Sequence, residues 1–221
     1  MRLVKWLCLI GGLGCMLAAC SSAPTPTEPS PAQYKQIFLE TFENKNNYWQ
    51  ETEDDKLGKA AYDADNQFRI KVSQAKTHIW SYPIAPATLS LGDVTVSVKA
   101  RTDDGDINNL YGVFCRYRNQ ENFYFFVISS DGYFGIGKMI EGKYQLINRN
   151  DYPPSSAILK KAQTNTIRAE CIKSTLSLYV NEELVDQQTD ADLISGRVGL
   201  IAAALGGTTE VVFDDFEVRG P

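Results

Sequence analysis

The sequence predicts an all-β protein, a two-sheet antiparallel jelly-roll sandwich, and three observations favour this fold class. Short segments alternate apolar and polar residues with the period of a strand, as in residues 68–72, 94–99 and 176–181. Turn-forming Gly, Asn, Asp and Pro residues separate these segments. No window of helical length repeats its apolar residues with a period of 3.6, and residues 156–161 could form one short turn at most.

The amino terminus has the pattern of an export signal. Arg2 and Lys5 precede an apolar run over residues 6–19, which is too short to cross a bilayer as a mature helix. The residues Leu17-Ala18-Ala19-Cys20 resemble the lipobox of bacterial lipoproteins, in which cleavage precedes a cysteine that receives diacylglycerol and an N-acyl chain. The resemblance implies that residues 1–19 are removed and that Cys20 is lipidated. The alternative is an ordinary secretory signal with an incidental cysteine.

A proline-rich segment follows and predicts a tether. Residues 20–33 hold four prolines among Ser, Thr and Ala, a composition that forms an extended, solvated spacer. The lipobox resemblance implies an exported protein attached to the cell membrane, either the outer membrane or the cell surface, with the bilayer as its partner through acylated Cys20. Residues 34–221 then form one jelly-roll domain, because neither an internal repeat nor a second linker interrupts them.

Charge argues against nucleic acid as a partner. Without residues 1–19 the chain holds 20 basic and 27 acidic residues, and no basic cluster is present. Such a balance disfavours both nucleic acid and anionic lipid surfaces.

Two cysteines remain in the expected mature domain. Cys115 and Cys171 alternate with polar neighbours in the same phase as aliphatic residues, so both are expected to face the core. An oxidising compartment favours a disulfide between them. The alternative is a pair of buried free thiols, which behave as small apolar side chains.

An aromatic hairpin is predicted over residues 123–138. Asp131-Gly132 is a strong signal for a two-residue type I′ turn, which would place Val127 opposite Ile136. Both faces of this hairpin would be apolar, whereas a half-solvated antiparallel hairpin has one polar face. One face would carry Phe123, Phe125, Val127, Phe134 and Ile136, and the other Tyr124, Phe126, Ile128 and Tyr133.

These segments together resemble a known family of sandwiches. The stretches GVFCRYRNQENFYFFVISSDGYFGIGK, NTIRAECIKSTLSLYVNEELV, SGRVGLIAA and VVFDDFEV are similar to the concanavalin A-like lectin/glucanase jelly roll, over about residues 37–219. More narrowly, they resemble laminin-G-like and 3-keto-disaccharide-hydrolase-like (DUF1080-type) domains of exported bacterial proteins. The resemblance implies two stacked sheets, one with a concave face that binds ligands. The family often has Asn-Gly after its LYV strand, so Asn181-Glu182 predicts a differently built turn.

The candidate ligand surface is the face opposite the core. With Cys115 directed inward, we expect Phe123 and Phe125 in the core. The concave face would then present aromatic rings, one guanidinium and glycine floor, which suit stacking on sugar rings and bonding to their hydroxyls. In the alternative interpretation the rings only pack on one another. The predicted ligand-binding residues are Phe114, Arg116, Tyr124, Phe126 and Tyr133, beside Gly112, Gly135 and Gly137.

Catalytic signatures are missing from the sequence. His78 is the only histidine, which excludes Ser-His-Asp, Cys-His and multi-histidine metal sites, and we interpret it as a strand residue. The E-x-D-x-x-E run of β-glucanases on this fold does not occur, and the acidic run over residues 51–55 is interpreted as a solvated loop. We therefore expect non-catalytic binding, most plausibly of a glycan. The alternatives are an enzyme like the 3-keto-glycoside hydrolases and a structural or protein-interaction module.

Calcium is the one metal that the sequence makes plausible. Glu40, Asp214 and Asp215 lie near the first and last predicted strands and offer the oxygen ligands that Ca²⁺ requires. Their spacing is not that of a compact calcium loop, which favours turn or bulge carboxylates without an ion. We therefore expect no metal and no cofactor.

Overall fold

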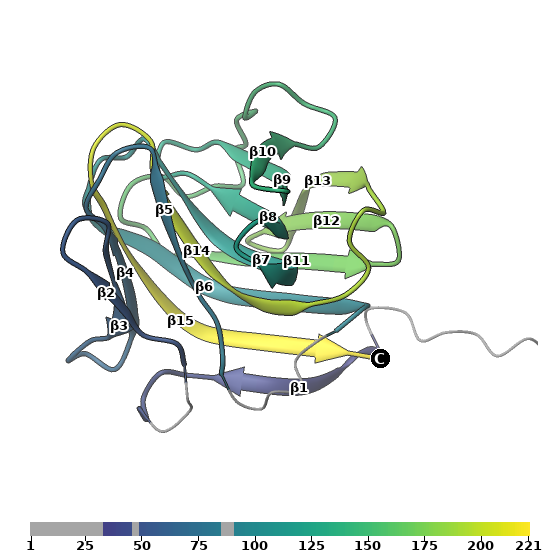
Figure 1. Ribbon diagram of the computed structural model, residues 1–221, viewed down its shortest axis with the longest axis horizontal. Coiled ribbons are helices and arrows are strands. Elements are labelled where there is room, and N and C mark those ends of the chain that lie inside the picture. Colours follow the sequence, from purple (N-terminus) through teal and green to yellow (C-terminus); the bar gives the residue numbers. More distant parts are fainter. Residues whose placement is uncertain (1–32, 46–48, 85–90) are drawn as a thin grey trace, which may run out of the picture.

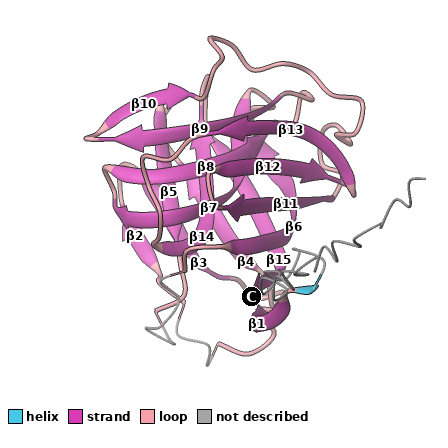
Figure 2. Cartoon of the chain, turned by 90° about the vertical axis from the view of Figure 1, so that its right-hand side faces the viewer, coloured by secondary structure: helices cyan, strands magenta, loops and turns pink. Residues whose placement is uncertain are grey.

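The computed structural model describes residues 33–45, 49–84 and 91–221, which form two antiparallel sheets packed face to face (Figures 1 and 2). This architecture confirms the predicted all-β sandwich. The predicted signal, Cys20 and almost all of the tether lie outside the described residues. Within the described ranges, no helix is long and apolar enough to cross a membrane.

The first sheet has nine strands and contains both ends of the described chain. Its order is β13-β12-β11-β6-β15-β4-β3-β2, and β1 pairs with the second half of β15. The acidic run predicted as a loop includes β2, a short and exposed edge strand. The bounds are β1 Lys35–Glu40, β2 Thr52–Asp54, β3 Gly58–Tyr62, β4 Phe68–Val72, β6 Val94–Gly105, β11 Asn165–Ile172, β12 Thr175–Val180, β13 Glu183–Thr189 and β15 Thr209–Gly220.

The second sheet has six strands in the order β10-β9-β8-β7-β14-β5. Figure 2 shows β10, β9, β8 and β7 as successive rungs of one layer, with β13, β12, β11 and β6 in the other. The bounds are β5 Thr77–Ser81, β7 Asn109–Asn119, β8 Asn122–Ile128, β9 Phe134–Ile140, β10 Lys143–Leu146 and β14 Arg197–Ala204.

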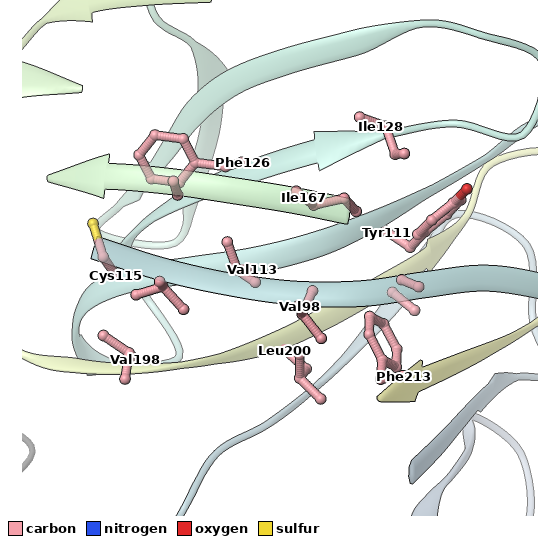
Figure 3. Packing of buried hydrophobic residues seen from close by; sticks show 14 of the residues in the cluster. Val98, Tyr111, Val113, Cys115, Phe126, Ile128, Ile167, Val198, Leu200 and Phe213 are labelled. Carbon is pink, nitrogen blue, oxygen red and sulfur yellow. The ribbon is translucent and has the colours of Figure 1, made fainter. Parts of the chain in front are cut away.

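The core lies between the two sheets (Figure 3). Val98 of β6 and Ile167 of β11 extend inward from the nine-stranded sheet, and Val113 of β7 and Leu200 of β14 meet them from the other. All four are 1% exposed or less, as expected for alternate positions of strands that bury one face. A disulfide between Cys115 of β7 and Cys171 of β11 joins the sheets, which confirms the predicted pairing.

The β8–β9 hairpin differs from the prediction by one residue of register. Ile128 pairs with Phe134 and Phe126 with Ile136, so residues 129–133 form a five-residue loop in place of the predicted two-residue turn. Gly132 takes a φ of +100°, and its N–H donates to the Ser129 carbonyl at 3.0 Å. Because side chains alternate along a strand, a shift of one residue exchanges the faces of β8 relative to those of β9.

The turn between β12 and β13 is also not the one expected. Asn181 and Glu182 have φ values of 51° and 68°, and Val180 pairs with Glu183. Positive φ at both central residues is the requirement of a type I′ turn. Glu182 therefore occupies a turn position that favours glycine, and Asn181-Glu182 forms the type of turn that Asn-Gly usually forms.

Candidate functional site

The outer face of the six-stranded sheet carries a second apolar cluster, separate from the core. We call it the outer aromatic face. Its buried members come from β7, β8, β9 and β14. Half-buried residues of β5, β7, β10 and β14, or of the segments that follow β5, β10 and β14, pack against them. The members are Leu110, Phe114, Phe123, Phe125, Val127, Met139 and Ile201, packed by Trp80, Tyr82, Tyr117, Leu146, Tyr152, Ala203 and Leu205.

The aromatic rings of this face form a continuous row. Ring centroids lie 5.5 Å apart for Tyr82 and Tyr117, 5.2 Å for Tyr117 and Phe114, and 6.0 Å for Phe114 and Phe123. At the far end Phe125 stacks on Tyr144 with a centroid distance of 5.2 Å and an interplanar angle of 13°.

Access differs along this row. The Phe rings are buried by their neighbours, whereas Tyr82 and Tyr117 are half-buried and Tyr144 is 51% exposed. Trp80 is also half-buried, and its side chain packs on the same cluster. The accessible aromatic surface is therefore made by Trp80, Tyr82, Tyr117 and Tyr144.

A β-bulge in β7 places Tyr117 on this face. Strict alternation from Cys115, which points inward, would put Arg116 outside and Tyr117 inside. Arg116 instead takes a φ of 52°, and the register with β14 shifts between the Tyr117–Arg197 and Phe114–Gly199 pairs. The extra residue restarts the alternation, so that Tyr117 joins Phe114 on the outer face.

The same bulge turns Arg116 into the interior, and its predicted place on the outer face is wrong. The side chain is buried, and its Nη1 donates to the Leu193 carbonyl at 2.8 Å. Its Nε donates to the Gly92 carbonyl at 3.3 Å. Arg116 thus ties two loops at one end of the sandwich together and offers no group to a ligand on the outer face.

The expected positions of Tyr124 and Phe126 on the outer face are also wrong. The register of β8 pairs Tyr124 with Cys115, so both aromatic residues point into the core. The Tyr124 hydroxyl bonds to the Asp190 carboxylate and accepts a hydrogen bond from the Leu193 N–H at 3.1 Å. Burial, with the Asp190 carboxylate second, raises the pKa of the Tyr124 hydroxyl above its ordinary value. Tyr124 is therefore a structural residue that anchors the β13–β14 loop.

Two predicted site residues remain outside the core. Phe114 lies on the outer aromatic face as expected, but neighbouring rings cover it completely. Tyr133 is 41% exposed in the β8–β9 loop, where it forms a bridge with Pro154. Phe123 and Phe125, which were expected in the core, are the aromatic residues that β8 presents on the outer face.

Aromatic rings occupy the space above the glycines of β9, so these glycines do not form an open surface for a ligand. A Cβ atom on Gly137 would lie 2.0 Å from Cζ of Phe125, and one on Gly135 would lie 2.7 Å from Cδ1 of Tyr152. A shallow depression of about 60 Å³ remains, lined among others by His78, Phe125 and Tyr144. At this depression of the described surface, a ligand would therefore lie across the rings and not in a deep pocket.

The polar groups of this face are few. The guanidinium carbon of Arg197 lies 4.9 Å from the centre of the Tyr82 ring. His78 is a strand residue of β5, as expected, and its ring lies 5.2 Å from that of Trp80. Burial lowers the pKa of His78. In the described chain, the six strands of this sheet contain neither Asp nor Glu.

The outer face of the nine-stranded sheet has the opposite character. It holds a groove of about 780 Å³ whose charged side chains pair with one another. Lys99 pairs with Asp215 at 2.7 Å, and Arg168 pairs with Glu170 while its guanidinium lies 3.7 Å over the Tyr179 ring. Because the charges are already paired and an arginine covers the tyrosine, this groove lacks free groups for stacking.

The three carboxylates considered for calcium are bonded to protein groups. Glu40 is buried and accepts a hydrogen bond from the Phe42 N–H at 2.6 Å. Asp215 pairs with Lys99, and Asp214 accepts from the Asp215 N–H at 2.8 Å. In the part of the chain that the structure describes, no group of three or more His, Cys, Asp or Glu side chains is arranged to hold a metal ion.

Sequence reasoning missed the accessible half of this site. His78, Trp80 and Tyr82 alternate in the stretch HIWSY, a signal that was available and that places all three on one side of a strand. Tyr117 had no such signal, because the bulge that redirects it breaks the alternation. Arg197 precedes the first alternating residue of its strand and is placed only by the pairing of β14 with β7.

No protein-family model and no curated protein sequence matches the chain. Its fold is similar to that of the CBM66 carbohydrate-binding module from Bacillus subtilis, with a TM-score of 0.61 and 14% identity over 79% of this chain and 96% of that one. It is also similar to a β-glucanase from Bacillus licheniformis, with a TM-score of 0.60 and 10% identity over 83% and 98% of the two chains.

A third similar structure is a protein of unknown function with a galectin-like fold from Bacillus subtilis. Its TM-score is 0.58, with 13% identity over 84% of this chain and 97% of that one. At such identities the similarities concern the fold alone, and they agree with the concanavalin A-like sandwich that the sequence predicted.

Proposed function

We propose that the protein is a non-catalytic glycan-binding domain and that the outer aromatic face is its binding surface. The observation that carries the proposal is the row of accessible rings on a sheet whose strands contain neither Asp nor Glu. Half-exposed Trp and Tyr rings offer flat apolar faces to the C–H groups of sugars and polar edges to their hydroxyls. Contiguous accessible apolar side chains on one face of a sheet are typical of an interaction site.

The similarity in fold to a carbohydrate-binding module and a glucanase supports the same proposal. It does so by analogy only, since one fold serves many functions. The residues that would bind the glycan are Trp80, Tyr82, Tyr117 and Tyr144, with Arg197 at one end of the row.

Hydrolysis is the less favoured function. Glycosidases of the common type place two carboxyl groups about 5–9.5 Å apart across the scissile bond. The strands under the outer aromatic face contribute apolar and aromatic cluster residues there and no Asp or Glu. The second alternative is a protein-interaction module, in which the same rings contact a protein in place of a glycan. A glycan-array screen without binding would favour this alternative.

We further propose that the domain is presented at the cell envelope as a lipoprotein. The lipobox-like residues 17–20 and the proline-rich residues 21–33 support an acylated Cys20 and a spacer. Two or more acyl chains give stable anchoring without a membrane-spanning helix. Labelled fatty acid should be incorporated by the native chain and not by a Cys20→Ala variant, and equal incorporation would contradict the proposal.

A glycan-array screen tests the binding function. The full chain is purified in a detergent without sugar groups and screened with added Ca²⁺ and with EDTA. We expect selective binding to one class of glycan, with the bound glycans recovered uncleaved. Loss of binding in EDTA would add a metal to the site, cleavage would favour the hydrolase, and a blank array from folded protein would contradict glycan binding.

A further inference from the structure

We infer that the outer aromatic face recognises an acidic glycan and that Arg197 binds its carboxylate. The inference rests on the proposed glycan-binding function and specifies the ligand class. Arg197 is the first residue of β14 and is half-buried beside the accessible rings. Its guanidinium carbon lies 4.9 Å from the centre of the Tyr82 ring. Among the described residues, its side chain has no ion pair and no hydrogen bond with a protein group.

Other half-buried or buried arginines of this domain all have polar partners. Arg69 pairs with Asp63, Asp103 and Glu210. Arg101 pairs with Asp103, Arg168 pairs with Glu170, and Arg116 donates to two carbonyl groups. In a chain with 27 acidic and 22 basic residues, a half-buried guanidinium without a carboxylate partner stands out.

The backbone holds Arg197 in a fixed position. Arg197 pairs with Tyr117 across the β14–β7 ladder. The preceding Gly196 has no room for a side chain, since a Cβ atom there would lie 2.4 Å from the carbonyl carbon of Arg116 and 2.6 Å from the Tyr117 carbonyl oxygen. The bulge that directs Tyr117 outward therefore also fixes the strand start that carries the guanidinium.

A guanidinium over an aromatic ring keeps its N–H groups free for other partners. Its five donors lie around its rim in one plane. Two parallel N–H groups match the two oxygens of a carboxylate, which gives a bidentate, charge-assisted pair. The adjacent Tyr82 and Tyr117 rings, 5.5 Å apart, then offer a platform for the ring of the same sugar.

The charge of the chain limits the ligand further. The formal net charge is −5, which repels a densely charged polyanion. The guanidinium of Arg197 beside the aromatic rings suits one carboxylate per binding site. The predicted ligand is therefore a glycan in which a uronic acid or another carboxylated sugar stands among neutral units.

The test uses oligosaccharides in matched pairs that differ only in a carboxylate, such as galacturonate and galactose oligomers, with the full chain in a detergent without sugar groups. We expect the native chain to bind the carboxylated member at least about tenfold more tightly. Arg197→Gln should remove this preference, so that the two members bind with similar affinity. Arg197→Lys keeps the charge but not the planar fork, and it should retain part of the preference.

Arg219→Gln is the matched control, because Arg219 lies on the opposite face and pairs with Glu217 at 2.9 Å. It should leave both affinities unchanged, and thermal unfolding checks that each variant is folded. Equal binding of both members by the native chain, or an unchanged preference in Arg197→Gln, would overturn the inference and leave glycan binding in place. Binding to neither member, nor to any other glycan, would overturn the proposed function together with the inference.

Discussion

Glu182 occupies a backbone conformation that glycine adopts with less strain. Its φ of 68° lies in the left-handed region, which an L-residue other than Gly, Asn or Asp enters at a cost. The Glu182 side chain is 77% exposed and its carboxylate lies 3.6 Å from the Arg168 guanidinium, so this ion pair contributes little to stability. We predict that Glu182→Gly raises the free energy of unfolding by about 1 kcal/mol. Urea denaturation measures the difference.

The neighbouring Glu183 provides the control for this substitution. It is equally exposed but starts β13 with ordinary strand geometry, so Glu183→Gly should lower stability through the added freedom of the unfolded chain. A loss of stability in both variants would show that the turn is not strained by Glu182.

His78 makes the stability of the outer aromatic face sensitive to acid. Burial lowers its pKa below the ordinary value of 6.5, so the unfolded chain binds a proton more readily than the folded one. The stability that neutral His78 contributes above pH 6.5 is therefore lost as the pH falls below that value. We predict that the melting temperature of the native chain drops more between pH 7.5 and 5.5 than that of a His78→Asn variant.

Carboxylates titrate in both the native chain and the His78→Asn variant. The difference between their changes in melting temperature with pH therefore reports on His78 alone. A Trp80→Phe variant, which keeps the histidine and an aromatic neighbour, should follow the native slope. Parallel slopes for the native chain and His78→Asn would contradict a buried, neutral histidine in β5.

At the scale of elements, the bulge in β7 determines which side chains form the site. Arg116→Ala would leave the Leu193 and Gly92 carbonyls without their donor and remove a fully buried side chain. We predict a loss of about 3 kcal/mol in the free energy of unfolding, together with weaker glycan binding, because Tyr117 and the β7–β14 register depend on the bulge. Arg118→Ala, two residues further and exposed, should change neither quantity.

The strands themselves were predictable because alternation is a local signal. Residues 68–72 form β4, and the phases of Cys115 and Cys171 led correctly to a disulfide between the sheets. The register of the β8–β9 hairpin was not predictable, since Asp131-Gly132 suits both a two-residue and a five-residue loop. Tertiary pairing with β7 chose the longer loop, and every side chain of β8 changed face as a result.

At the scale of the whole molecule, the two outer faces of the sandwich carry different kinds of side chains. The nine-stranded sheet presents charged residues that pair with one another, and the six-stranded sheet presents aromatic rings beside the guanidinium of Arg197. The sequence alone indicated a hairpin with two apolar faces and therefore an apolar face outside the core. It could not indicate the correct members from β7 and β8, because a bulge and a shift of one residue in register decide which of their rings point outward.

The most direct test of glycan binding at the outer aromatic face compares glycan-array binding by the native chain with that by Trp80→Ala. Tyr179→Ala serves as the control, because Tyr179 lies in the groove of the opposite sheet beneath Arg168. Loss of a stacking ring should weaken binding about tenfold or more, whereas Tyr179→Ala should bind like the native chain. Undiminished binding by a folded Trp80→Ala variant, or loss of binding in Tyr179→Ala alone, would contradict a binding surface on the outer aromatic face.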